Sequence, residues 1–238
     1  MAAESVLAVQ GLSAWYGRAQ ILFDVGLDVA RGEVVALMGR NGAGKSTTLK
    51  SIMGLVERTR GEVVFRGRSL RWMEPFEIAR LGLGYVPEDR RIFTELSVRE
   101  NLEVGRQPPR VGAPSWTAEK LFRIFPNLAE MGARAGGRMS GGEQQMLTVA
   151  RTLMGNPFLV LLDEPSEGIA PRIVEEMANM ILELKKEGLS VVLCEQNLHF
   201  AALVSDRAYV IEKGQIRYRG TMQELAANEA VKREYLGL

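Results

Sequence analysis

The chain has 238 residues, of which 46% are hydrophobic and 25% are charged, so it can bury a full core. Its 30 basic and 29 acidic residues leave a net charge of +1, which provides no global attraction to nucleic acid or to an anionic membrane. Cys194 is the single cysteine, so an internal disulfide framework is excluded. The composition predicts one globular domain over residues 1–238, or one domain that carries a large insertion.

Membrane insertion is also excluded by the sequence pattern. No stretch approaches the ~20 apolar residues that span a bilayer. The first residues, Met1 to Ser5, have neither the basic cluster nor the apolar core of a secretory signal. We therefore expect a cytosolic protein that reaches a membrane only by docking on other subunits.

The N-terminal part of the chain has the pattern of half-buried antiparallel strands. Apolar residues alternate with polar or small ones over residues 7–9 and again over residues 25–29. Residues 31–32 then turn the chain into residues 34–38, a short apolar run that predicts a buried strand. This order predicts a small antiparallel sheet beside a parallel one.

The segment after this run matches the phosphate-binding pattern G-x-x-x-x-G-K-[ST] without substitution. Its residues are Gly39, Arg40, Asn41, Gly42, Ala43, Gly44, Lys45, Ser46 and Thr47. A helix is predicted over residues 46–53, so the order is strand, glycine loop, helix. The alternative is a glycine-rich turn that caps an ordinary helix, and both flanks argue against it.

A loop of this kind attracts a triphosphate. Glycines let backbone N–H groups turn inward, the helix N-terminus adds partial positive charge, and Lys45 adds a full one. Ser46 would supply a hydroxyl ligand for Mg²⁺, which takes few protein oxygens together with phosphate oxygens. The pattern therefore implies Mg-ATP or Mg-GTP.

The middle of the chain changes from strands to helices. Residues 62–65 and 83–86 are predicted strands, with a short helix over residues 75–81 between them. From residue 88 to residue 155 helical signals dominate, with capping residues at Ser97 and Thr117, the second helix ending near Pro126. We expect this segment to be a helical insertion in an α/β core.

A second capping box lies late in this insertion. Ser140 is followed three residues later by Glu143, and Met146, Val149 and Leu153 form an apolar stripe along the helix that this box opens.

The C-terminal part returns to alternating strands and helices. Residues 158–162 are apolar at every position, as in a central parallel strand, and residues 171–187 form an amphipathic helix. A buried strand over residues 191–194 and a hairpin over residues 208–218 follow, and Thr221 caps a last short helix.

Two carboxylates end the apolar strand. The carboxyl edge of a parallel sheet is where such a fold places its active site. Asp163 would hold Mg²⁺ opposite Ser46, directly or through water, and Glu164 would polarise the water that attacks the γ-phosphate. The alternative is an acidic turn after a core strand.

These features together resemble the ATP-binding subunits of ABC transporters over essentially the whole chain. The specific element is residues 139–145, Met-Ser-Gly-Gly-Glu-Gln-Gln, which are similar to the signature L-S-G-G-Q of that family. The resemblance implies a P-loop fold with a mainly parallel RecA-like core sheet and an N-terminal antiparallel β-subdomain, over residues 1–87 and 156–238. Residues 88–155 would form the helical subdomain that carries the signature.

The resemblance also implies a head-to-tail dimer of ATPases. In the family, each ATP lies between the glycine loop of one subunit and the signature of the other. The signature residues here are Ser140, Gly141, Gly142 and Glu143. Ser140 and the free N–H groups of Gly141 and Gly142 at a helix N-terminus suit a γ-phosphate held by another chain. ATP would then close the dimer and hydrolysis would reopen it.

Three further positions are assigned through the resemblance. Tyr16 stands where the family stacks an aromatic ring on adenine, although it could equally be one more strand aromatic. Glu88 replaces the usual glutamine that contacts Mg²⁺ and senses the membrane subunits. Gln196 replaces the usual histidine at the γ-phosphate; it can donate a hydrogen bond but cannot carry a proton, so Glu164 would bear more of the catalysis. His199 is not our candidate for that role.

Four segments, residues 85–88, 140–145, 163–171 and 194–197, together resemble one of the two ATPases of bacterial branched-chain amino-acid importers. Partners would be a second ABC ATPase, different or identical to this one, two integral membrane permeases and, indirectly, a periplasmic binding protein. The chain would sit peripherally on the cytoplasmic face of the inner membrane, without a role for nucleic acid.

Several alternative functions are consistent with part of this sequence. Importers of urea, amides or aromatic acids look much alike, and a lipopolysaccharide exporter is a further option that the residues around Gln196 argue against. A soluble ABC ATPase acting on ribosomes or DNA does not fit the length and charge, and a P-loop kinase or GTPase would make the signature a coincidence.

Overall fold

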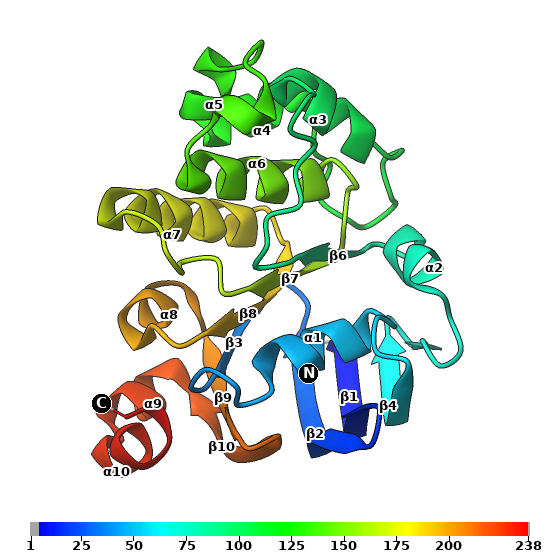
Figure 1. The fold of residues 1–238 in the computed structure, drawn as a ribbon, viewed down its shortest axis with the longest axis vertical. Helices are drawn as coiled ribbons and strands as arrows, with labels where there is room; N and C mark the ends of the chain where they lie inside the picture. Colours follow the sequence, from blue (N-terminus) through cyan, green and yellow to red (C-terminus); the bar gives the residue numbers. More distant parts are fainter. Residues whose placement is uncertain (1–4, 238) are drawn as a thin grey trace.

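The computed structural model describes residues 5–237, which form two sheets and a layer of helices (Figure 1). The prediction about the first residues of the chain falls mainly on residues 1–4, outside the described part. The larger sheet contains β3 (Val34–Met38), β6 (Leu83–Val86), β7 (Leu159–Asp163), β8 (Ser190–Glu195), β9 (Arg207–Glu212) and β10 (Gln215–Thr221). The smaller sheet contains β1 (Ser5–Tyr16), β2 (Ala19–Ala30), β4 (Arg58–Phe65) and β5 (Arg68–Ser69).

The two sheets differ in strand direction, as the sequence predicts. The larger sheet has the order β10-β9-β3-β8-β7-β6, and all its pairings are parallel except that of β10 with β9. The smaller sheet has the order β2-β1-β4-β5 and is antiparallel throughout. The predicted antiparallel sheet beside a mainly parallel core is therefore confirmed.

Helices occupy most of the remaining chain. They are α1 (Lys45–Ile52), α2 (Pro75–Arg80), α3 (Val98–Gly105), α4 (Ala118–Ile124), α5 (Pro126–Glu130), η1 (Gly136–Arg138), α6 (Gly141–Leu153), α7 (Pro171–Lys186), α8 (Leu198–Val204), α9 (Met222–Ala227), α10 (Glu229–Val231) and the π-helical η2 (Lys232–Leu236). Helices α3 to α6 follow β6 and precede β7, and they form the layer at the top of Figure 1. The capping boxes predicted at Ser97, Ser140 and Thr221 are all present.

Two parts of the helix prediction were incomplete. Pro126 ends one helix, as expected, but it also opens α5, because a proline at the first helical position needs no N–H partner. The chain also continues past the last predicted helix into α10 and η2, which end at Gly237 in a left-handed conformation (φ 75°).

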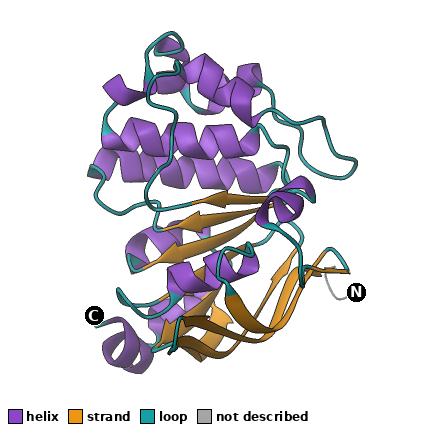
Figure 2. Cartoon of the chain, turned by 45° about the vertical axis from the view of Figure 1, so that its right-hand side comes forward, coloured by secondary structure: helices purple, strands orange, loops and turns teal. Residues whose placement is uncertain are grey.

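The larger sheet is buried on both faces. In β3, Val34, Ala36 and Met38 face one hydrophobic cluster, with the α6, α7 and α8 side chains. The alternate residues, Val35 and Leu37, face a second cluster, with α1 and the antiparallel sheet. Figure 2 shows the sheet between these layers. The burial on both faces explains why its strands are apolar at nearly every position.

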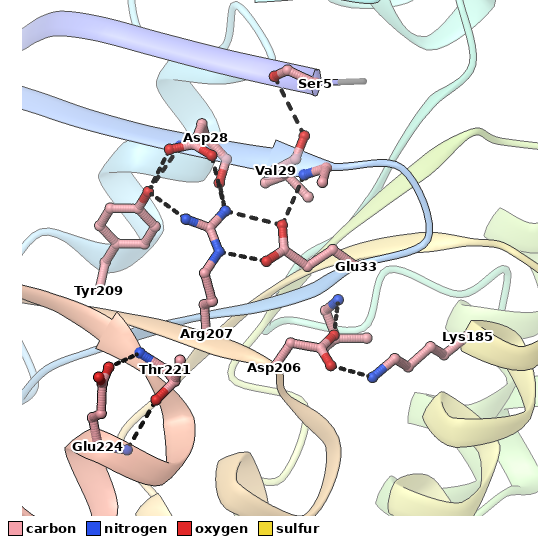
Figure 3. Close-up of polar contacts among 12 residues, drawn as sticks. Ser5, Asp28, Val29, Glu33, Lys185, Asp206, Arg207, Tyr209, Thr221 and Glu224 are labelled. Atoms are coloured by element: carbon pink, nitrogen blue, oxygen red, sulfur yellow. Dashed lines mark hydrogen bonds and ion pairs between the residues drawn. The ribbon is translucent and has the colours of Figure 1, made fainter. Parts of the chain in front are cut away.

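One polar network fastens the two sheets together (Figure 3). Arg207 at the start of β9 contacts Asp28 of β2 at 2.9 Å and Glu33, just before β3, at 2.5 Å. The hydroxyl of Tyr209 also donates to Asp28, at 2.8 Å. The hydrogen bonds and charges of both carboxylates, which outweigh burial, raise the pKa of Arg207, so its charge is permanent. The guanidinium thus joins β2 to the N-terminal ends of β9 and β3 in the core sheet.

We expect Arg207→Ala to lower the free energy of unfolding by about 2 kcal/mol, because it leaves Asp28 and Glu33 as unpaired neighbouring carboxylates. The loss should be below that of a fully buried pair because the Asp28 side chain is 46% exposed. The measurement is urea unfolding at neutral pH. Lys186→Ala, which removes an exposed pair with Glu183, is the control. An equal loss of unfolding free energy in both variants would contradict a stabilising role of Arg207 between the two sheets.

Candidate functional site

The glycine loop connects β3 to α1 and needs its glycines for two different reasons. Gly44, just before α1, has a φ of 114°, a conformation that L side chains rarely adopt. Gly39 has no such angle, but a Cβ built on it would lie 2.5 Å from Ile211 O. The loop therefore packs against β9 at its start and turns sharply into the helix at its end.

Lys45 is the centre of the candidate site. Its side chain is buried, and Nζ donates to the carbonyl oxygens of Gly39 at 2.7 Å and Arg40 at 3.0 Å. Nζ also lies 2.9 Å from Glu164 Oε1. The ammonium therefore closes the loop on itself and ties it to the carboxyl end of β7.

The residues predicted to hold Mg²⁺ lie together. Ser46 Oγ donates to Asp163 Oδ1 at 2.9 Å. The hydroxyl of Tyr85, at the end of β6, donates to the other oxygen, Oδ2, at 3.1 Å. Burial raises the pKa of Asp163 above its ordinary value, against the hydrogen bonds from Ser46 and Tyr85 and the charge of Lys50, which lower it. A cation beside this carboxylate would offset its desolvation.

Glu164 is paired with Lys45 rather than open to the surface. Its backbone is left-handed (φ 47°), which is strained for this residue type, and its N–H donates to Cys194 O at 3.0 Å. Burial raises the pKa of Glu164, but the hydrogen bonds from Glu167 and Lys45 outweigh it and hold the pKa below its ordinary value. Glu164 is thus ionised at neutral pH.

Glu167 provides a second carboxyl group beside Glu164. The sequence assigned it no role at this site. The hydrogen bond with Glu164, followed by burial and nearby carboxylates, raises the pKa of Glu167 to about 7. Glu164 Oε2 is buried and has no hydrogen-bond partner in the described part of the chain. The two carboxyl groups are one turn apart, since Glu167 N donates to Glu164 O.

A cleft of about 550 Å³ opens beside these residues. It is lined by Tyr16, Lys50, Leu55, Tyr85, Pro87, Glu88, Asp89, Arg91 and Asp163. Tyr16 is half-exposed there, and Glu88 lies at the same opening as Asp163. The structure therefore brings both residues to the cleft, while their contacts with nucleotide and metal stay predictions.

The donor set fits Mg²⁺ bound together with a phosphate. Within residues 5–237, no group of three or more His, Cys, Asp or Glu side chains is placed to hold a metal ion by itself. Ser46 and Asp163 instead offer two hard oxygen ligands at the mouth of a phosphate loop. This small number suits Mg²⁺, which fills the rest of its octahedral shell with water and phosphate oxygens.

At the end of β8, the buried side chain belongs to Glu195, one residue before Gln196, the residue predicted to contact the γ-phosphate. Gln196 is exposed, whereas the preceding residue, Glu195, is buried and accepts hydrogen bonds from Ser166 N at 3.0 Å and Asn197 N at 3.3 Å. Glu195 ties this segment to the turn after Glu164. The role of Gln196 at a γ-phosphate stays a prediction, and His199 lies on the exposed side of α8.

The signature residues lie in another layer, away from the glycine loop (Figure 1). Ser140 precedes α6, and its Oγ accepts from Glu143 N at 3.4 Å while Glu143 Oε2 accepts from Ser140 N at 2.6 Å. Gly141 and Gly142 open the helix, and neighbours pack closely on both. No hydrogen bond or ion pair of the described residues joins this segment to residues 39–47, so the signature and the glycine loop are separate in one chain.

Comparisons with known proteins agree on the family. The family model described as ABC transporter matches residues 22–167. The chain is 41% identical to the high-affinity branched-chain amino acid transport ATP-binding protein BraG of Pseudomonas aeruginosa, over 98% of this chain and all of the relative. It is 34% identical to the lipopolysaccharide export system ATP-binding protein LptB of Escherichia coli, over 98% of each chain.

Solved structures show the same similarity. A nucleotide-free ATP-binding cassette from an ABC transporter matches with a TM-score of 0.82 and 26% identity, over 99% of each chain. The ADP conformation of an ATP-binding cassette of an ABC transporter matches with a TM-score of 0.80 and 28% identity, over 96% of this chain and 97% of that one.

We expect Lys45→Ala to weaken nucleotide binding by about a hundredfold, because it removes the only buried ammonium of the described residues from the loop. Titration with a fluorescent ATP analogue measures the affinity. Lys213→Ala, at a side chain that is 84% exposed, is the control for loss of a lysine. Unchanged affinity in a folded Lys45→Ala protein would remove the phosphate loop from the site.

Proposed function

This chain belongs to the ABC transporter ATP-binding family, and we propose that it is the ATP-hydrolysing subunit of a bacterial importer for branched-chain or related amino acids. One observation carries the catalytic part of the proposal. Two contacts of 2.9 Å, Lys45 with Glu164 and Ser46 with Asp163, join the glycine loop to the end of β7. This arrangement supports binding and hydrolysis of Mg-ATP.

Each residue has a distinct role in the proposed reaction. Lys45 neutralises phosphate charge, and its three present acceptors are the oxygens that the β- and γ-phosphates would replace. Ser46 and Asp163 would hold Mg²⁺, which when bound neutralises charge on the phosphates. Glu164, released from Lys45, orients the attacking water and accepts its proton. Tyr16 would stack on adenine at the edge of the cleft.

The separation of the signature from the glycine loop supports a head-to-tail pair of ATPases. Ser140, Gly141 and Gly142 lie at the N-terminus of a helix of 13 residues, where free N–H groups and the helix dipole favour a phosphate. Within one chain they stand apart from the glycine loop. A second ATPase would supply the missing half of each site, and a different ATPase is favoured over an identical one by the resemblance to importers that use two.

Membrane coupling requires other subunits. In the described part of the chain, no helix is long and apolar enough to cross a bilayer. A groove of about 440 Å³ between the core and the helical layer is lined in part by Phe93, Gly84 and Arg151, and Phe93 is half-exposed. We propose that one of the two permeases docks at this groove, near Glu88 and the helical insertion, and that the chain lies on the cytoplasmic face of the inner membrane.

The nature of the cargo is inferred from relatives rather than from the site. The 41% identical relative is described as a branched-chain amino acid transport protein, and the 34% identical one as a lipopolysaccharide export protein. Gln196 favours the importer, because the exporter subgroup usually has histidine at that position. A periplasmic binding protein would select the cargo, so urea, amides and aromatic acids stay alternatives within the same proposal.

We expect Glu164→Gln to bind ATP and to hydrolyse it about a hundredfold or more slowly, because the amide cannot accept the proton of the attacking water. Single-turnover hydrolysis in the assembled complex measures the rate. Glu130→Gln, at an exposed residue at the end of α5, is the matched control. A wild-type rate in Glu164→Gln would exclude Glu164 as the general base.

The transport proposal is tested by purifying the Glu164→Gln chain from its native host in detergent with Mg-ATP. We expect a second ABC ATPase and two polytopic membrane proteins to accompany it. The binding protein encoded with them then identifies the cargo by ligand binding. Co-purification with lipopolysaccharide-export components, with ribosomes or with nucleic acid would overturn the importer assignment and leave the ATPase assignment intact.

A further inference from the structure

Tyr85 is a polar residue of the site to which the sequence assigned no role. It lies near the end of β6, and its register partner on β7 is Leu161. The side chains of Leu159 and Leu161 pack on the face of the sheet that α1 covers, and Asp163 continues the same alternation. Tyr85 packs on this face as well, so its hydroxyl reaches Asp163 from the neighbouring strand.

The carboxylate of Asp163 has one donor on each oxygen. Ser46 Oγ donates to Oδ1 at 2.9 Å, and the Tyr85 hydroxyl donates to Oδ2 at 3.1 Å. Ser46 and Asp163 are both proposed ligands of Mg²⁺, so both change their bonding when the cation binds. Tyr85 is the partner of this carboxylate that is not itself a proposed ligand.

A hydrogen bond of this kind orients a metal ligand. Groups that hold a ligating carboxylate fix its direction, and their removal weakens metal binding by about 10- to 100-fold. With Oδ2 held by Tyr85, Asp163 presents Oδ1 toward Ser46 as a single-oxygen ligand. Without that hydroxyl, the carboxylate can rotate and must lose this freedom when the metal binds.

We propose that Tyr85 is a positioning residue that sets the Mg²⁺ affinity of the ATP site by holding Asp163 Oδ2. The inference rests on the proposed function, because it assumes that Ser46 and Asp163 are the ligands. Tyr85 lies outside the glycine loop, the signature and the Asp163–Glu164 pair. Phenylalanine at position 85 would fill the same space and lack only the donor.

The test compares Tyr85→Phe with Tyr209→Phe. Both substitutions remove a tyrosine hydroxyl that donates to an aspartate, Asp163 in one case and Asp28 in the other. Binding of Mn²⁺ as the probe is measured by electron paramagnetic resonance with a non-hydrolysable ATP analogue present. We expect about tenfold weaker Mn²⁺ binding in Tyr85→Phe and unchanged binding in Tyr209→Phe. Nucleotide affinity in excess EDTA should be unchanged in both.

Two further measurements separate the possible outcomes. The Mg²⁺ concentration that half-saturates hydrolysis should rise about tenfold in Tyr85→Phe, with the rate at saturating Mg²⁺ within about twofold of wild type. Wild-type Mn²⁺ affinity in Tyr85→Phe, alongside weakened binding in Asp163→Asn, would overturn the inference and leave the proposed function standing. Wild-type Mn²⁺ affinity in Asp163→Asn would instead overturn the metal site on which both depend.

Discussion

The ion pair between Lys45 and Glu164 is the contact on which the candidate site depends. It joins the start of α1, which follows β3 and the glycine loop, to the residue after β7, and β8 separates these two strands in the sheet. The parallel register sets their spacing, because Met38 pairs with Glu195 and Asp163 pairs with Cys194. Three strands therefore end level at one edge. The bond from Glu164 N to Cys194 O then turns the carboxylate back toward the glycine loop.

The helical layer is linked to this edge through the segment that follows β6. Thr148 Oγ1 of α6 donates to Arg90 O, and Arg151 of the same helix donates to Arg91 O. Both contacts bind α6 to backbone just beyond Glu88, a residue of the cleft beside Asp163. Tyr85 lines the cleft and also the groove between the core and the helical layer. The helical layer therefore meets the core at the end of β6, beside the candidate metal ligand Asp163.

The sequence predicted the parts of this site that local patterns determine. A glycine loop between strand and helix, and two carboxylates after an apolar strand, placed Ser46 opposite Asp163, and the structure brings them within hydrogen-bond distance. The role of Tyr85 could not be predicted, because a strand of four residues does not reveal which side chains face α1. The pairing of Lys45 with Glu164 depends on a left-handed residue at Glu164, which nothing in its residue type indicates. The subdomain boundaries at residues 88 and 155 stay predictions.

The charges at this edge explain why a nucleotide would enter with its cation. Asp163, Glu164 and Glu195 are buried carboxyl groups, and Lys45 is the buried ammonium among the described residues that faces them. Burial raises the pKa of Glu195, as it does that of Asp163, because the charged form of a carboxyl group is disfavoured away from water. A bare triphosphate would add negative charge beside these carboxyl groups, which the loop amides and the α1 dipole offset only in part. If Ser46 and Asp163 hold Mg²⁺ as proposed, the cation would offset the charge of both the carboxylate and the phosphates, so Mg-ATP would be favoured over free ATP.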